Sequence, residues 1–352
     1  LSHIIWIENY LNGNNFEVIR DTADIEKINF AQPLSIFLIN CSNITFRNIP
    51  HASVILMYSC ENISINNLHM ENYGLFTLRF CQNVQIHNIT IENLKWGALK
   101  ILGSYEIEIS DSTFQNCTGH GISLTSVEGL SIRDSHFYNN AECGLYIINA
   151  AQVSISKSHI ERNYHGMCLL RIEELQIINC TISNNSGNGI VGMILDEFLL
   201  QNTFVYGNLQ NGFDIIHSED GYIVDNHFNS NNKSGIMVRF LSGFLISSNR
   251  FVSNRLFGIG FENCFPQSSI NSTFFENGKA NHFQYFCNKT VNDQYYQFSN
   301  EILYQKEPLY YEWEYGSSTT YFSFSRGYSS NSLNADYFIS QVWLDDNDYE
   351  VE

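Results

Sequence analysis

Four polar residues in the second half of the chain combine an acid, a base and a cation, and three of them are separated by 23 to 25 positions. His217 follows Asp214 by 3 residues, Arg239 follows Asp214 by 25, and Glu262 follows Arg239 by 23. If the chain repeats with this step, these side chains come from successive repeats and could converge within hydrogen-bonding reach. Carboxylates beside a cationic group can do acid–base chemistry on a sugar, with the arginine holding an acidic group of the substrate. Asp214, His217, Arg239 and Glu262 are therefore the candidate catalytic residues; the alternative is a ladder of ion pairs between repeats.

The elements that position these residues are set by a repeat of about 23 residues. Successive blocks begin at Leu75, Ala98, Gly121, Gly144, Gly166, Gly189, Gly212, Gly235 and Gly258, and shorter blocks begin at Ser35 and Val54. Within a block, apolar residues alternate with polar ones in three short runs, which is the period of a β-strand. Three strands per block without helix signals predict an all-β fold, a right-handed parallel β-helix of about eleven turns, or rungs. Equivalent side chains should then stack at about 4.8 Å.

The repeat also divides the chain. We expect the β-helix over residues 35–281, an N-terminal cap and irregular first rung over 1–34, and an aromatic-rich C-terminal cap with an acidic end over 282–352. Caps are expected because an open β-helix end exposes unpaired strand edges.

Asparagine recurs once in almost every block. Its amide can bond the amide above and below, and asparagine tolerates left-handed turns. We therefore predict a structural asparagine ladder, which comprises Asn72, Asn93, Asn116, Asn139, Asn163, Asn184, Asn208, Asn231, Asn254 and Asn277.

Equivalent positions of successive blocks form columns of stacked side chains. The apolar columns point inward, so the residues beside them in each strand must point outward, where ligands can reach them. Beside the first strand these include Arg79, Lys100 and Tyr146, which are the candidate substrate-binding residues. The middle rungs are apolar there, and such a patch usually marks a contact surface. Either the C-terminal segment or another subunit, such as a second copy in a homo-oligomer, could cover the patch, whose first-strand residues are Ile148, Cys168, Leu170, Val191, Met193, Ile216 and Met237.

A second outward column contains His69, His136, His159 and His227. His136 and His159 would stack in adjacent rungs, but two imidazoles without a supporting carboxylate or thiolate make a weak metal site. We expect a solvated polar ladder there, and no metal or cofactor. Cys41, Cys60 and Cys81 share another column, which fits either a disulfide or a stack of buried thiols, while Cys264 and Cys287 could join the C-terminal cap.

Composition narrows the partners. The chain has 36 acidic and 18 basic residues, which disfavours nucleic acid. No apolar stretch approaches the roughly 20 residues of a membrane helix, so we expect no membrane partner. Ten Asn-x-Ser/Thr sequons gently favour an extracellular or surface-exposed protein.

The repeat resembles the right-handed parallel β-helix superfamily, including pectate-lyase-like and sugar-hydrolase repeat proteins, over about residues 35–280. The segment Gly119-His120-Gly121 is similar to one in polygalacturonases, whose paired aspartates are absent here. Gly212-Phe213-Asp214-Ile215-Ile216-His217 resembles a Tyr-Gly-Phe-Asp-Pro-His-Asp segment of mannuronan C5-epimerases, but Ile215 replaces the proline and the histidine sits one place late. The resemblance implies an extracellular protein that binds a polysaccharide and could process it as a lyase, hydrolase or epimerase. The alternative is a non-enzymatic assembly subunit that uses the apolar outer rungs as an interface.

Overall fold

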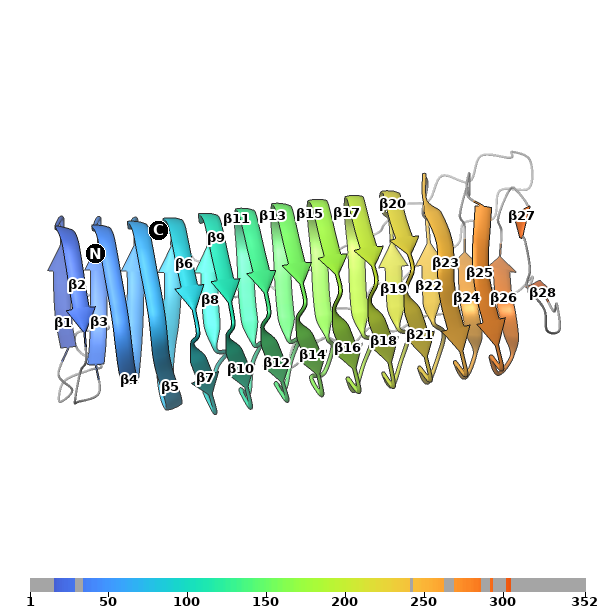
Figure 1. Ribbon diagram of the computed structural model, residues 1–352, viewed down its shortest axis with the longest axis horizontal. Helices are drawn as coiled ribbons and strands as arrows, with labels where there is room; N and C mark the ends of the chain where they lie inside the picture. Colours follow the sequence, from blue (N-terminus) through green and yellow to red (C-terminus); the bar gives the residue numbers. More distant parts are fainter. Residues whose placement is uncertain are drawn as a thin grey trace, which may run out of the picture. The chain divides into compact units, whose positions relative to one another are not determined.

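The computed structural model describes residues 16–28, 34–240, 243–262, 269–285, 292–293 and 302–304. Strands coil about one axis throughout this part of the chain (Figure 1), and every strand pair is parallel. No helix occurs in the described residues, so none there is long and apolar enough to cross a membrane. The predicted parallel β-helix is confirmed.

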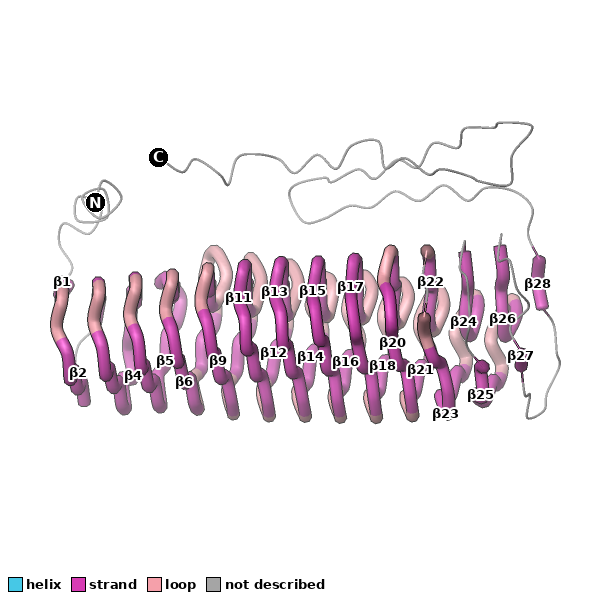
Figure 2. The backbone as a smooth tube through the Cα atoms, turned by 90° about the horizontal axis from the view of Figure 1, so that it is seen from above, coloured by secondary structure: helices cyan, strands magenta, loops and turns pink. Residues whose placement is uncertain are grey.

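Each rung contributes to three parallel sheets that enclose the core (Figure 2). The first sheet contains β1 (Phe16–Arg20), β3 (Leu34–Ile39), β8 (Leu99–Leu102), β19 (Phe213–Ile216), β22 (Ile236–Arg239), β24 (Phe257–Glu262), β26 (Ala280–Tyr285) and β28 (Ile302–Tyr304). The second contains β2 (Ala23–Ile28), β6 (Gln82–His87), β9 (Tyr105–Ser110), β20 (Glu219–Val224) and β27 (Asn292–Asp293). The third contains β7 (Thr90–Glu92), β10 (Thr113–Gln115), β12 (His136–Tyr138), β14 (His159–Glu161), β16 (Thr181–Ser183), β18 (Phe204–Tyr206) and β21 (His227–Asn229).

Longer strands turn a corner and serve more than one sheet. They are β4 (Ser42–Tyr58), β5 (Glu61–Arg79), β11 (Ile122–Arg133), β13 (Leu145–Ser156), β15 (Met167–Ile178), β17 (Ile190–Gln201), β23 (Leu245–Val252) and β25 (Ser269–Phe275).

The core is built by stacking like on like. Ile132 lies in register with Ile155, and Ile155 with Ile177, and all three are at most 1% exposed. The rings of Phe228 and Phe251 stack with centroids 5.1 Å apart. A step of one rung therefore places equivalent apolar side chains directly on one another, as the period predicts.

The asparagine ladder exists, but as two neighbouring columns rather than one. Asn116 and Asn139 lie exposed or half-buried at a left-handed corner, with φ values of 55° and 53°. Asn163 belongs to the next column inward, which is buried and continues through Asn185 and Asn208. The single predicted column is wrong because the steps from Asn139 to Asn163 and from Asn184 to Asn208 are 24 residues, one more than a rung, and cross from one column to the other.

Close backbone contact explains the glycine that opens most blocks. A Cβ on Gly189 would lie 2.6 Å from the carbonyl oxygen of Gly212 in the next rung, and one on Gly212 would lie 2.5 Å from that of Gly235. No side chain fits at that distance, so the rungs approach closely only where this column is glycine.

Parallel strand pairing continues into both flanking segments. Strands β1 and β2 lie within residues 1–34, the segment expected to hold an N-terminal cap and an irregular first rung, and they pair with β3 and β4, while β28 pairs with β26 beyond residue 281. The hydrogen-bonded pairing extends there because short alternating runs continue outside the regular 23-residue blocks. Residues 1–15 and 305–352, which belong to the predicted caps, lie outside the described residues. So do Cys264 and Cys287, which were predicted to join the C-terminal cap.

Candidate functional site

Asp214, Arg239 and Glu262 converge on the outward side of the first sheet, from β19, β22 and β24. Arg239 Nη1 donates to Asp214 Oδ1 over 2.6 Å, and Arg239 Nε lies 3.4 Å from Glu262 Oε2. Asn211 Nδ2 donates to the other oxygen, Asp214 Oδ2, over 3.1 Å. Asp214 is 3% exposed and Arg239 5%. The structure therefore brings together three of the four predicted residues, and they form a buried polar cluster.

The two carboxyl groups of this cluster have different surroundings. Burial raises the pKa of Glu262, the nearby Asp214 carboxylate raises it further, and Arg239 opposes both effects. Asp214 instead receives hydrogen bonds on both of its oxygens. Such a difference between paired carboxyls is what acid–base chemistry needs, but a buried ion pair also occurs as a purely structural feature.

His217 does not join the cluster. It has φ = 49° at the corner where β19 ends, so its side chain leaves the face that carries Asp214. Its ring stacks on Phe240 with centroids 4.5 Å apart, and among the described residues its buried Nε2 has no hydrogen-bond partner. Burial lowers the pKa of His217. The prediction that His217 converges with Asp214 is wrong because the left-handed corner after Ile216 turns its side chain away from the strand face.

Arg79, Lys100 and Tyr146 lie on the same outward face of the first sheet, several rungs away. Lys100 and Tyr146 share the column of Asp214, and Arg79 shares that of Arg239. Arg79 and Lys100 are exposed, whereas the Tyr146 ring stacks on His120 with centroids 4.5 Å apart. At about 4.8 Å per rung, Lys100 lies about 24 Å from Asp214, so these residues do not form one compact site.

The predicted apolar patch between them is largely covered. Four of its seven first-strand residues, Cys168, Val191, Ile216 and Met237, are between 3% and 6% exposed. The loops that precede the first-sheet strands pack over this outward column. Cys143 in one loop forms a disulfide with Cys168, and Asn211 in another bonds Asp214. Ile148, Leu170 and Met193 of the same predicted patch are half-buried, so the loops cover part of the expected interface and leave part of it accessible.

The Cys143–Cys168 disulfide was not predicted. Its two residues are 25 positions apart, one 22-residue rung plus three residues, and that spacing was the available signal. Cys41, Cys60 and Cys81 are instead free and buried, and each thiol donates to a nearby backbone carbonyl oxygen. For these three, the stack of buried thiols is confirmed.

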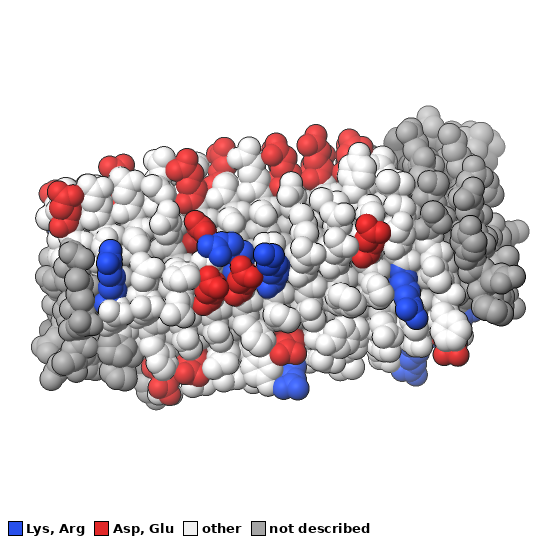
Figure 3. All heavy atoms as spheres, viewed as in Figure 1, with Lys and Arg blue, Asp and Glu red and all other residues white. Residues whose placement is uncertain are grey.

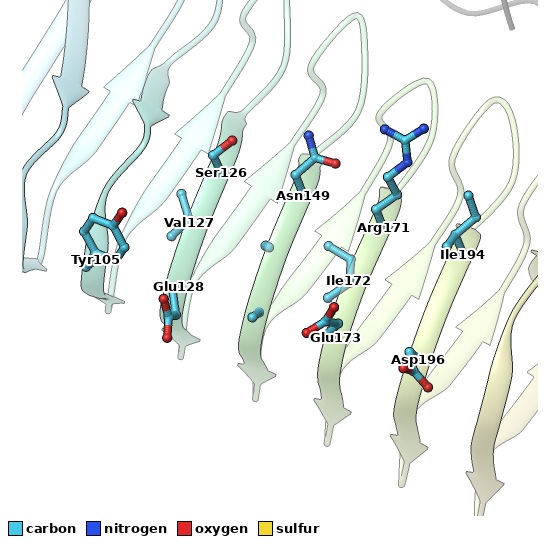
Figure 4. A pocket seen from close by; sticks show the side chains of 12 residues that line it. Tyr105, Ser126, Val127, Glu128, Asn149, Arg171, Ile172, Glu173, Ile194 and Asp196 are labelled. Carbon is cyan, nitrogen blue, oxygen red and sulfur yellow. The ribbon is translucent and has the colours of Figure 1, made fainter.

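A groove of about 620 Å³ runs along the corner between the first and second sheets (Figure 4). The small side chains of Ala150 and Ala151 leave room between the two edges of the groove. One edge carries Ser126, Asn149, Arg171 and Ile194, and the other carries Tyr105, Glu128, Glu173 and Asp196. The lining spans five rungs, about 19 Å at the strand spacing. Sequence reasoning missed the groove, although a small residue in an inward column, Ala150, next to one in an outward column, Ala151, was a signal.

Acidic side chains gather beside this groove. Asp and Glu residues line the upper edge of the molecule in Figure 3, above β9 to β20. Arg171 is a basic residue within the groove, but exposed acids outnumber it along the same corner, namely Glu106, Glu128, Glu173, Glu174, Asp196, Glu197, Glu219 and Asp220. The groove is therefore an anionic surface.

On the third sheet, His69 and Glu71 of β5 lie beside Glu92 of β7. His69 Nε2 is 3.0 Å from Glu92 Oε1, and one ligand atom from each of the three residues lies within 4.8 Å of the others. Within the residues that the structure describes, this is the one group of three His, Cys, Asp or Glu side chains so arranged. The expectation that the histidine column lacks supporting carboxylates is wrong, because Glu92 contacts His69 and Glu161 contacts His136.

Two family models match the chain. A model described as right-handed β-helix region matches residues 27–171. A model described as periplasmic copper-binding protein (NosD) matches residues 119–310, more than half of the chain. The chain belongs to the NosD family. The predicted membership of the right-handed parallel β-helix superfamily is confirmed.

No curated protein matches the chain in sequence. Solved structures with a similar fold include the periplasmic alginate epimerase AlgG, at 12% identity and TM-score 0.44, covering 78% of this chain and 77% of that one. The Pseudomonas phage phi297 tailspike gp61 is 12% identical with TM-score 0.45, covering 78% of this chain and 50% of the tailspike. The catalytic unit of an α-1,3-glucanase from Streptomyces thermodiastaticus is 11% identical with TM-score 0.39, covering 79% and 63%.

Proposed function

We propose that this NosD-family chain binds a polysaccharide along the groove between Tyr105 and Asp196. The observation that carries the proposal is the shape and lining of that groove. It is open and follows the helix axis over five rungs, and hydroxyl, amide and carboxylate groups line it. The ring of Tyr105, 51% exposed, stands at one end, where it can stack on a sugar face. An extended chain of sugars presents the hydroxyl groups and apolar ring faces that such a lining binds.

The charge of the groove specifies the kind of polysaccharide. Glu128, Glu173 and Asp196 face the ligand with Arg171 as counter-charge. Like charges across an interface are unfavourable, whereas opposite charges increase the association rate. The ligand is therefore a neutral or amino-sugar polymer rather than a polyuronate.

Binding assays with three soluble polymers test this proposal: a neutral glucan, a chitosan oligosaccharide and a polyuronate. Tyr105→Ala should weaken binding of the preferred polymer about tenfold, since losing one stacked ring costs about 1.4 kcal/mol. Ala151→Trp should block the groove. Tyr222→Ala is the matched control, because Tyr222 is 53% exposed on β20 and does not line the groove. Equal affinity of the Tyr105 and Tyr222 variants, or preference for the polyuronate, would contradict the proposal.

Chemistry on the bound polymer is a separate part of the proposal, and it assigns Asp214, Arg239 and Glu262 the acid–base roles. The raised pKa of Glu262 suits a proton donor, and Arg239 holds Asp214 in place. If turnover of a bound polymer is found, Asp214→Asn should abolish it, whereas Asp225→Asn, an exposed change directly after β20 and outside the groove lining, should retain it. Unchanged turnover in Asp214→Asn would leave the cluster a structural one.

The assembly-subunit alternative has less support than the sequence indicated, because four of the seven first-strand residues of its predicted interface are buried and the other three are half-buried. A size measurement in dilute solution separates the two functions: a monomer agrees with a free groove, and a filament or discrete oligomer with assembly.

An oxidising compartment outside the cytoplasm agrees with the Cys143–Cys168 disulfide and with the family description. The family description names copper. The described residues of 119–310 hold no cluster of three His, Cys, Asp or Glu side chains that could bind it, so no step of this proposal uses copper.

A further inference from the structure

The third sheet carries an arrangement of side chains that neither groove nor buried cluster uses. His69 and Glu71 are two positions apart on β5, so both project from the same outward face. Glu92 on β7 lies in register with Glu71, one rung away. One imidazole and two carboxylates therefore meet on a backbone fixed by parallel strand pairing.

We propose that His69, Glu71 and Glu92 bind a divalent transition-metal ion, with Cu²⁺ held most tightly. Imidazole and carboxylate ligands suit Cu²⁺ and Zn²⁺, and the order of affinities among first-row divalent ions places Cu²⁺ highest. The site has no thiolate or thioether, so it does not suit Cu⁺. It lies outside residues 119–310, and the proposal rests on the arrangement of these side chains rather than on the family model.

The geometry agrees with a shared ion. The three ligand atoms already lie within 4.8 Å of one another, and small side-chain rotations bring them to the roughly 2.0–2.2 Å metal–ligand distances that Zn²⁺ sites show. Gln115 Nε2 donates to Glu92 Oε2 over 2.8 Å, which leaves Oε1 facing His69. Partners of this kind orient metal-binding carboxylates. The side chains of His69 and Glu92 are 38% and 20% exposed, so an ion can reach them from solvent.

The same sheet offers an internal comparison two rungs beyond Glu92. His136 occupies the column of His69, and Glu161 occupies that of Glu92, with His136 Nε2 3.2 Å from Glu161 Oε1. Tyr138 stands where the first site has Glu71, so the second carboxylate is missing. The ring of His159 lies in the next rung, with its centroid 5.7 Å from that of His136, but among the described residues only the proposed site has three ligand atoms within 4.8 Å of one another.

The test is Cu²⁺ titration of the tag-free protein, followed by calorimetry and by electron paramagnetic resonance, with circular dichroism to confirm that each variant folds. We expect the wild type to bind one Cu²⁺ through a single nitrogen, and His69→Ala to lose that binding. Affinity should fall at least about tenfold in Glu71→Gln and Glu92→Gln, the loss that even outer partners of a metal site can cause. His136→Ala, which breaks the comparison pair, should bind as the wild type does.

Zn²⁺ gives a second readout, because it should shift the His69 ring resonances in the nuclear magnetic resonance spectrum before those of His136. The proposal is overturned if the wild type binds neither ion, if His69→Ala keeps wild-type stoichiometry and affinity, or if His136→Ala shows the same loss as His69→Ala. Polysaccharide binding is measured separately and does not depend on the outcome.

Discussion

Replacing Asn208 by alanine tests whether the buried amide ladder holds the rungs together. Asn208 is fully buried and its side chain makes four hydrogen bonds. Its Oδ1 accepts from the backbone N–H and the side-chain amide of Asn185, at 3.1 and 2.9 Å. Its Nδ2 donates to the carbonyl oxygen of Ile182 at 3.3 Å and to Asn231 Oδ1 at 3.0 Å. Alanine removes all four bonds at once.

The cost follows from which partners keep another bond. Asn185 Nδ2 also donates to the Ile160 carbonyl oxygen, and Asn231 Oδ1 also accepts from the Asn208 backbone N–H. The Asn185 backbone N–H loses the side-chain oxygen that it donates to. One buried donor left without an acceptor costs about 1–3 kcal/mol, and the loss of the other three hydrogen bonds of the Asn208 side chain adds about 1 kcal/mol. We therefore expect Asn208→Ala to lower the free energy of unfolding by about 3 kcal/mol.

Urea denaturation followed by circular dichroism measures this loss. Asn232→Ala is the control, because Asn232 is exposed and should change stability by less than about 0.5 kcal/mol. A loss below about 1 kcal/mol in Asn208→Ala, or an equal loss in both variants, would refute the argument that the ladder stabilises the coil.

Three further perturbations follow from the structure. Phe251→Ala removes a fully buried ring stacked between Phe228 and Phe274, at 5.1 and 5.0 Å, and should cost about 3–5 kcal/mol in the same assay. Replacing Cys143 and Cys168 by serine opens a loop of 25 residues and should lower stability by about 3 kcal/mol, while reductant should destabilise only the wild type. Because burial raises the pKa of Glu262, the stability that its protonated form contributes is present below its ordinary pKa and is lost as pH rises through the raised one. Glu262→Gln should therefore gain stability relative to wild type between pH 4 and pH 8, and a constant difference would contradict the raised pKa.

The fold was predictable because one rung is nearly constant in length. A step of 22 or 23 residues predicts that Ile132, Ile155 and Ile177 stack, and their register follows that step. The same arithmetic predicts that Asp214, Arg239 and Glu262 meet, since neighbouring rungs place them about 4.8 Å apart along the axis.

The remaining features depend on corners and loops, where a period of two gives no guidance. His217 turns away because its backbone is left-handed, and Asn163 lies one column from Asn139 because Arg162 occupies the left-handed corner of its rung. The burial of Val191 depends on loops that fold back, and alternation along a strand does not predict their paths. The groove likewise depends on the size of Ala150 and Ala151 rather than on their polarity.

The constant register of the rungs has a consequence for how such a chain can change in length. A segment of 23 residues, such as 167–189, begins and ends at the same point of the coil, so its duplication would preserve every stack and ladder on either side. The groove would then lengthen by one strand spacing, about 4.8 Å, with each copy. Ligand length could thereby evolve in fixed increments, by recombination between repeats, without any new packing having to be found.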